Sequence, residues 1–154
     1  MNRRELARAL SNPESIVSAE RPSEPWCVLG VTGAPGVGKS CLVDHIVQKW
    51  LDIGERVAIL AVDPSSPITG GALLGDRMRM SSVDDGESVF FRSIATRNLP
   101  GGVPSHLNRM VDLLIEQGWT KVIIETVGAG QSEIRVVAVA DRILLVEGPA
   151  RGDV

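Results

Sequence analysis

Blocks of apolar and polar residues along the chain predict buried strands separated by helices. Residues 26–32 (WCVLGVT) form a nearly continuous apolar run that is followed by Gly33, which is typical of a strand buried on both faces. Runs of the same kind at 56–62, 121–127 and 142–146 predict three further strands. Residues 88–95 alternate weakly and predict one more.

Two amphipathic helices are expected between these runs. Apolar residues recur at three- and four-residue steps over 40–51, and Gly54 follows as a helix stop. The same spacing returns over 107–115, with Pro104 in the first turn and Gly118 as the C-cap. Strands that alternate with helices predict an α/β fold with a mostly parallel sheet, which binds ligands at the carboxyl ends of its strands.

The chain divides into a short lead-in and one domain. Residues 1–25 are expected to form an N-terminal helix over 2–10 and a linker rich in proline, whereas residues 26–154 form the α/β domain. A chain of 154 residues is long enough for one hydrophobic core. The Pro-, Ser- and Gly-rich stretch 64–75 is expected to be a functional loop.

Composition excludes several classes of protein. The chain is 44% hydrophobic and 23% charged, as in folded domains, and its net charge of −3 offers no field that would hold nucleic acid. No apolar run is long enough to span a membrane, and the N-terminus has no apolar segment of a secretory signal, so a cytoplasmic protein is expected. The two cysteines, Cys27 and Cys41, are interpreted as small buried residues.

A phosphate-binding loop is the clearest motif. Residues 33–40 (GAPGVGKS) fit the pattern G-x-x-x-x-G-K-[ST] at every position, and they follow a predicted strand and open a predicted helix. Backbone N–H groups and the helix N-terminus can then face a polyphosphate, while Lys39 neutralises its charge and the Ser40 hydroxyl binds Mg²⁺. This predicts a three-layer fold of the P-loop NTPase type; a glycine-rich turn chosen for tight packing is the alternative.

Acidic residues at strand ends are expected to complete a magnesium site. Asp63 ends the run 56–62, and Glu125 lies near the end of the run 121–127, in a strand-acid-x-x-Gly pattern whose Gly128 N–H can sense a γ-phosphate. Asp76 is a third candidate. Alternatively, Asp63 caps a turn, Asp76 caps a helix and Glu125 is an exposed acid. The predicted nucleotide-binding residues are Gly33, Ala34, Pro35, Gly36, Val37, Gly38, Lys39, Ser40, Cys41 and Gly128.

Catalysis of hydrolysis is assigned to Lys39 and Gln131. In Ras-like proteins a Gln that positions water directly follows the glycine, but Ala129 has that place here and Gln131 comes two residues later. Slow intrinsic hydrolysis is therefore expected.

Two longer strings carry a resemblance to a known family. Residues 61–71 (AVDPSSPITGG) and 125–133 (ETVGAGQSE) closely resemble the ArgK/MeaB family of P-loop GTPases, and the resemblance runs from about Val28 to Asp153. That family is associated with methylmalonyl-CoA mutase, and the resemblance implies a GTP-hydrolysing metallochaperone that gates cobalamin loading onto an acyl-CoA mutase. Mg²⁺ and GTP or GDP are the implied ligands, and the resemblance assigns the metal and switch roles to Ser40, Asp63, Asp76 and Glu125.

The chain also departs from that family. Guanine-binding proteins read their base with an Asn-Lys-x-Asp loop, and no such string occurs among these 154 residues. In the family that loop and a dimerisation arm lie beyond the position that corresponds to Val154. A sheet that lacks its C-terminal strands is therefore expected. Two alternatives stay open: an ATP-dependent kinase or transport-type ATPase that uses the same loop, and a nucleotide-binding fragment without turnover.

Overall fold

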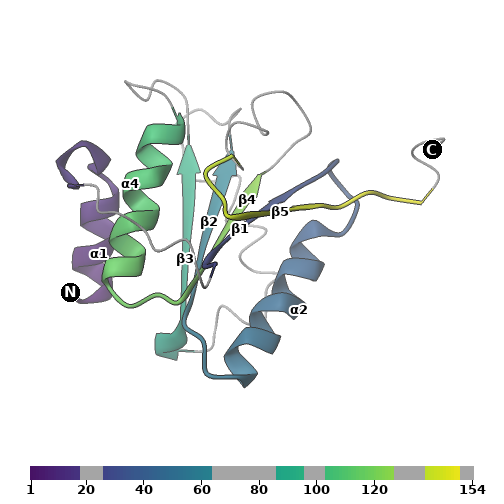
Figure 1. The fold of residues 1–154 in the computed structure, drawn as a ribbon, viewed down its shortest axis with the longest axis horizontal. Helices are drawn as coiled ribbons and strands as arrows, with labels where there is room; N and C mark the ends of the chain where they lie inside the picture. Colours follow the sequence, from purple (N-terminus) through teal and green to yellow (C-terminus); the bar gives the residue numbers. More distant parts are fainter. Residues whose placement is uncertain (18–25, 64–85, 96–102, 127–137, 150–154) are drawn as a thin grey trace.

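The computed structural model describes residues 1–17, 26–63, 86–95, 103–126 and 138–149 (Figure 1). The predicted helices and strands that fall in these ranges are present, with boundaries that differ by a few residues. In chain order the elements are α1 (Arg3–Leu10), η1 (Pro13–Ser15), β1 (Val28–Thr32), α2 (Lys39–Asp52), β2 (Val57–Asp63), η3 (Gly86–Ser88), β3 (Val89–Ala95), α4 (Val103–Glu116), β4 (Lys121–Thr126) and β5 (Arg142–Leu145).

The sheet has five parallel strands in the order β3-β2-β4-β1-β5. Helix α2 covers one face, and helices α1 and α4 cover the other (Figure 1). The three-layer α/β fold expected from the alternation of strands and helices is confirmed. Because all strands run in one direction, the carboxyl ends of β1, β2 and β4 lie at the same side of the sheet, which we call the carboxyl edge.

Side chains alternate between two hydrophobic clusters, one on each face of the sheet. On β4, Ile123 packs with Val43 and Val47 of α2, whereas Val122 and Ile124 pack in the cluster of α1 and α4. The strands are therefore buried on both faces, which explains their continuous apolar runs.

The N-terminal helix packs on the α/β core. Asn2 and Glu5 form a capping box at the start of α1. Leu6 and Leu10 are buried in the cluster that α1 shares with α4 and the sheet. Arg92 of β3 donates hydrogen bonds to Ala7 O (2.6 Å) and Ser11 Oγ (2.8 Å) near the end of α1. Burial lowers the pKa of the Arg92 guanidinium from its ordinary value. The helix is thus held by both apolar and polar contacts.

The strand β5 is an outermost strand of the sheet and pairs with β1. Ile143 and Leu145 are both more than half exposed, at 55% and 59%. An edge strand with exposed branched side chains presents an apolar surface that a partner or further chain can cover.

Candidate nucleotide-binding site

The glycine loop connects β1 to α2 and keeps open space in front of its backbone. Gly36 and Gly38 have positive φ angles of 77° and 94°, which side chains rarely adopt. Among the described residues, no atom would lie within 4 Å of a Cβ at either position. Glycine is therefore required here by backbone conformation, and the described residues leave space beside these two positions.

The first residue of the loop is glycine for two reasons. Gly33 also has a positive φ angle, of 144°, and a Cβ there would clash with the backbone carbonyl of Val146, just after β5. The Val146 N–H also donates to Thr32 O at 2.8 Å, so the chain after β5 lies directly against the start of the loop. Close packing therefore adds to backbone conformation at Gly33, but not at Gly36 or Gly38 among the described residues.

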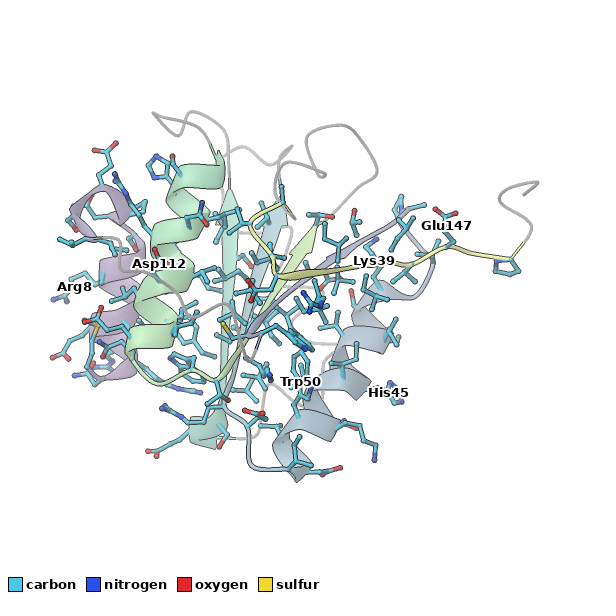
Figure 2. All side chains as sticks on the ribbon, viewed as in Figure 1. Arg8, Lys39, His45, Trp50, Asp112 and Glu147 are labelled. Carbon is cyan, nitrogen blue, oxygen red and sulfur yellow. The ribbon has the colours of Figure 1, made fainter. Side chains whose placement is uncertain are left out.

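Lys39 places its charge against the loop. Its ammonium donates to the carbonyl oxygens of Gly33 (2.7 Å) and Ala34 (2.9 Å), and the residue is only 7% exposed (Figure 2). A buried ammonium is stable only where such acceptors or an anion compensate its charge. The N-terminus of α2 lies at the same place, with Gly38 as an N-cap that has no side chain to satisfy the first N–H groups. Cation and helix terminus together form an arrangement that is suited to binding an anion.

Ser40 and Glu125 meet at the carboxyl edge. The Ser40 hydroxyl donates to Glu125 Oε1 at 2.9 Å, and Glu125 is only 6% exposed. Glu125 lies opposite Val31 in the register of β4 with β1, which places it beside the strand that leads into the loop. The carboxylate is therefore buried, and the interpretation of Glu125 as an exposed strand-end acid is wrong.

Comparison with known proteins identifies the family. The family model described as "Methylmalonyl Co-A mutase-associated GTPase MeaB" matches residues 16–154. This chain belongs to the MeaB family. The resemblance to ArgK and MeaB inferred from the sequence motifs is confirmed.

Two relatives and one solved structure show how much of the length of similar proteins this MeaB-family chain covers. It is 39% identical over 133 residues to GTPase ArgK of Escherichia coli, covering 84% of this chain and 40% of ArgK. It is 39% identical over 126 residues to a Caenorhabditis elegans protein named methylmalonic aciduria type A homolog, mitochondrial, covering 81% of this chain and 32% of that protein. The crystal structure of a LAO/AO transport system kinase superposes with a TM-score of 0.65 at 27% identity, covering 95% of this chain and 46% of that one. The chain thus spans less than half the length of these relatives.

The remaining predicted site residues of this MeaB-family chain are placed only in part. The backbone of Asp63 ends β2 at the carboxyl edge, as the sequence predicts. Asp76, Gly128 and Gln131 lie outside the described residues. Their roles, and the metal and catalytic roles of all candidates, stay predictions.

One interpretation of a side chain needs correction. Cys27 is buried as expected, but Cys41 is exposed. Cys41 lies in the first turn of α2, whose buried stripe is formed by Val43 and Val47, so its position on the helix turns it toward solvent. The backbone of Cys41 stays in the helix turn next to the loop, where a nucleotide-binding residue is expected.

Two threonines that the sequence analysis did not single out form a hydrogen bond between β1 and β4, the strands that lead to the site. The Thr126 hydroxyl, which is fully buried, donates to Thr32 Oγ1 at 3.2 Å. Thr32 directly precedes the glycine loop and Thr126 directly follows Glu125. Their positions next to motif residues could have marked them as candidates, but that they pair with each other depends on the strand register.

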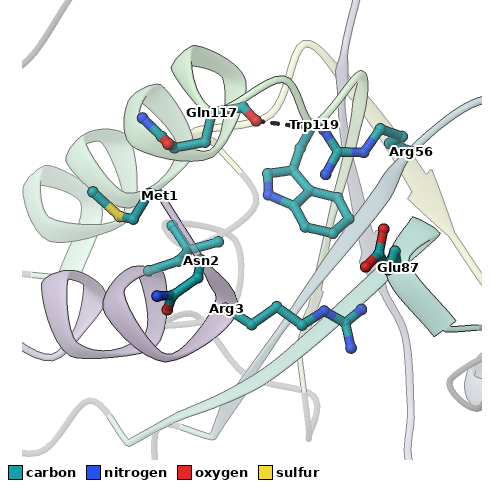
Figure 3. A pocket seen from close by; sticks show the side chains of 8 residues that line it. Met1, Asn2, Arg3, Arg56, Glu87, Gln117 and Trp119 are labelled. Carbon is teal, nitrogen blue, oxygen red and sulfur yellow. Dashed lines mark hydrogen bonds between the residues drawn. The ribbon is translucent and has the colours of Figure 1, made fainter.

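A pocket of about 260 Å³ lies at the opposite, amino edge of the sheet (Figure 3). The Arg56 guanidinium stacks over the ring of Trp119 at 4.6 Å and donates to the carbonyls of Gln117 (3.5 Å) and Gly118 (3.2 Å). The pocket shares no residue with the glycine loop. Its lining residues are Met1, Asn2, Arg3, Leu6, Arg56, Glu87, Gln117 and Trp119.

None of the helices within the described ranges combines the length and the apolarity needed to cross a bilayer.

Proposed function

We propose that this chain is the nucleotide-binding part of a Mg²⁺-dependent GTPase that binds GTP and GDP and hydrolyses GTP. The observation that carries the proposal is the open glycine loop beside the buried ammonium of Lys39, which donates to Gly33 O and Ala34 O. Membership of a GTPase family supports guanine as the base.

The geometry of the loop supports the proposal that it binds phosphate. The positive φ angles of Gly36 and Gly38 shape a backbone that leaves room for a polyphosphate, and the N-terminus of α2 favours negative charge there. Lys39 is already held at the loop by two backbone carbonyls, so little side-chain entropy is lost when phosphate oxygens arrive. Lys39 acts by neutralising charge that develops on the phosphates.

The pair of Ser40 and Glu125 suits magnesium. Mg²⁺ prefers oxygen ligands, keeps several waters and is usually held by one or two carboxylates together with phosphate oxygens. A hydroxyl and a buried carboxylate 2.9 Å apart supply such oxygens. We assign Asp63 and Asp76 as further ligands, direct or through water. When bound, the ion would neutralise charge on the β and γ phosphates.

Turnover is assigned to residues of the 125–133 motif. Gln131 would orient the attacking water, and the Gly128 N–H would contact the γ-phosphate and link hydrolysis to movement of the following chain. Because Gln131 is displaced by two residues from the Ras-like position, we expect slow hydrolysis without a partner.

The proposed partner is a cobalamin-dependent acyl-CoA mutase, for which the protein would act as a GTP-dependent chaperone. Two findings support this: the family description names methylmalonyl-CoA mutase, and a C. elegans relative is named for methylmalonic aciduria.

Nucleotide-dependent melting tests the nucleotide-binding part of the proposal. With Mg²⁺ present, GTP and GDP should raise the melting temperature, because a ligand at 100 times its Kd stabilises the folded chain by about 2.7 kcal/mol. Replacing the carboxylate in Glu125→Gln should weaken the effect of Mg²⁺ while the exposed-site control Glu87→Gln should not. A melting temperature that no nucleotide changes would overturn the proposal.

An ATP-dependent kinase is the second candidate, because a similar solved structure carries the name of a transport system kinase. Incubation with γ-labelled ATP or GTP separates the two. Free labelled phosphate from GTP supports the GTPase, and label on an acceptor supports the kinase. GTP binding without either product supports a fragment that binds without turnover.

A further inference from the structure

Two threonines connect the strands that carry the two halves of the candidate site. Backbone pairing of β1 with β4 runs from Val28 opposite Val122 to Val31 opposite Glu125. One step further, the Thr126 hydroxyl donates to Thr32 Oγ1 at 3.2 Å. The hydroxyl bridge therefore extends the strand pairing beyond Glu125, to the position where the glycine loop begins.

The bridge lies on the sheet face opposite to the candidate metal ligands. Glu125 reaches Ser40 of α2, whereas its neighbour Ile124 packs in the cluster of α1 and α4. Because side chains of a strand alternate between faces, Thr126 points to the same side as Ile124, away from Ser40. The bridge can influence the site only through the backbone of β1 and β4.

Because Thr126 is buried, its hydroxyl requires a hydrogen-bond partner, and Thr32 is that partner. Thr126 is 0% exposed, and a buried hydroxyl without a hydrogen bond is costly. A valine has almost the same shape and no hydroxyl that needs a partner, so packing alone does not require threonine here. Each threonine is held by the backbone to another strand as well, Thr32 to β5 and Thr126 to β2. The bridge thus ties the two halves of the sheet at the carboxyl edge.

We propose that Thr126 and Thr32 are positioning residues, whose hydroxyl bridge fixes the separation between the glycine loop and Glu125 and thereby sets how strongly Mg²⁺ enhances nucleotide binding. This inference rests on the proposed function. Phosphate binding by the loop and Lys39 does not need the bridge, because their contacts lie within residues 33–40. The coordination of one ion by Ser40 and Glu125 does need it, because those residues come from different elements.

The chain offers a matched control at the other end of β4. Thr120 accepts a hydrogen bond from Arg56 N (2.8 Å) and donates to Arg56 O (3.2 Å), which joins the beginnings of β4 and β2. Removing that hydroxyl also breaks a link between two strands, but at the edge far from the loop.

The experiment is titration of the 154-residue chain with a fluorescent GDP analogue, once with Mg²⁺ and once with EDTA. The ratio of the two Kd values measures the enhancement by Mg²⁺. Thr126→Val should reduce this ratio about twofold to tenfold, the effect of losing one neutral hydrogen bond, while the Kd in EDTA changes less than twofold. Thr126→Ser should restore the ratio, and Thr120→Val should leave it unchanged although it lowers the melting temperature.

Thr32→Val carries the same test if Thr126→Val does not fold, because Thr32 is only partly buried and should tolerate the change. The double variant should be no worse than the single ones, since both remove the same bond. A lower melting temperature with an unchanged Mg²⁺ ratio would show that the bridge only stabilises the fold and would overturn the inference. Absence of nucleotide binding by the unmodified chain in both buffers would instead overturn the proposed function, and the inference with it.

Discussion

The two edges of the sheet use similar residues for opposite purposes. Lys39 at the carboxyl edge and Lys121 at the amino edge both donate to backbone carbonyls, Lys121 to Trp26 O at 2.9 Å. The Lys121 ammonium also lies 4.6 Å from the ring centre of Trp26 and 5.9 Å from that of Trp50. Lys39 instead faces a loop with open space.

The difference between the edges separates stability from binding. At the amino edge the cations Lys121 and Arg56 are covered by aromatic rings, which stabilises the fold and leaves little for a ligand to gain. At the carboxyl edge the buried Lys39 and Glu125 are compensated by short polar contacts within the site. Groups held in this way can exchange these contacts for those of a ligand.

Trp119→Ala should give the largest effect and should act on stability alone. Trp119 is 3% exposed, packs against Phe90 with ring centres 5.7 Å apart and lies under Arg56. Its loss should lower the free energy of unfolding by about 3–5 kcal/mol. Urea unfolding at low temperature measures this. The nucleotide Kd of the folded fraction should change less than twofold; a larger change would break the proposed separation of the edges.

Lys39→Ala should have the opposite signature. Loss of a charged hydrogen-bonding group should weaken GTP binding on the order of 100-fold, equivalent to about 2.7 kcal/mol. Lys121→Ala is the matched control, because it removes an ammonium that donates to a backbone carbonyl at the other edge. It should lower the melting temperature by a few degrees and leave the Kd unchanged. Equal effects of both variants on the Kd would contradict the assignment of Lys39.

Gly38→Ala sharpens the comparison along a single helix. Gly38 is the N-cap of α2 and Gly54 follows the helix. Both have positive φ angles (94° and 84°), and no atom of the described residues lies within 4 Å of the point where a Cβ would be. Each alanine variant should therefore lose about 1–2 kcal/mol of stability from backbone strain. Only Gly38→Ala should also weaken GTP binding, as measured by titration. If Gly54→Ala weakens it equally, the effect comes from α2 as a whole and not from the loop.

The sequence predicted the architecture because the strands are buried on both faces and the helices have clear apolar stripes. The meeting of Ser40 with Glu125 was also predictable, since parallel strands bring their carboxyl ends to one edge. The bridge between Thr32 and Thr126 was not, because it depends on the register of two strands about 90 residues apart along the chain, as their hydrogen bond shows.

Two other features differ in what the sequence could have told. Leu6 and Leu10 lie one turn apart on α1, but a sequence pattern does not say which surface buries them. The exposure of Cys41 could have been read from its place off the stripe of Val43 and Val47, whereas its residue type favoured burial.

Asn2→Ala should give the smallest effect. It tests whether α1, like the amino edge, contributes to stability without affecting the loop. The Asn2 side chain accepts from Glu5 N at 2.9 Å and lines the pocket beside Trp119. Loss of this cap should cost about 1 kcal/mol. Hydrogen exchange should show faster opening of α1 with unchanged protection of α2, because Leu6 and Leu10 hold α1 in the cluster on the other face of the sheet. Faster exchange in α2 would mean that the two faces open together, and that the stability of the amino edge also supports the loop.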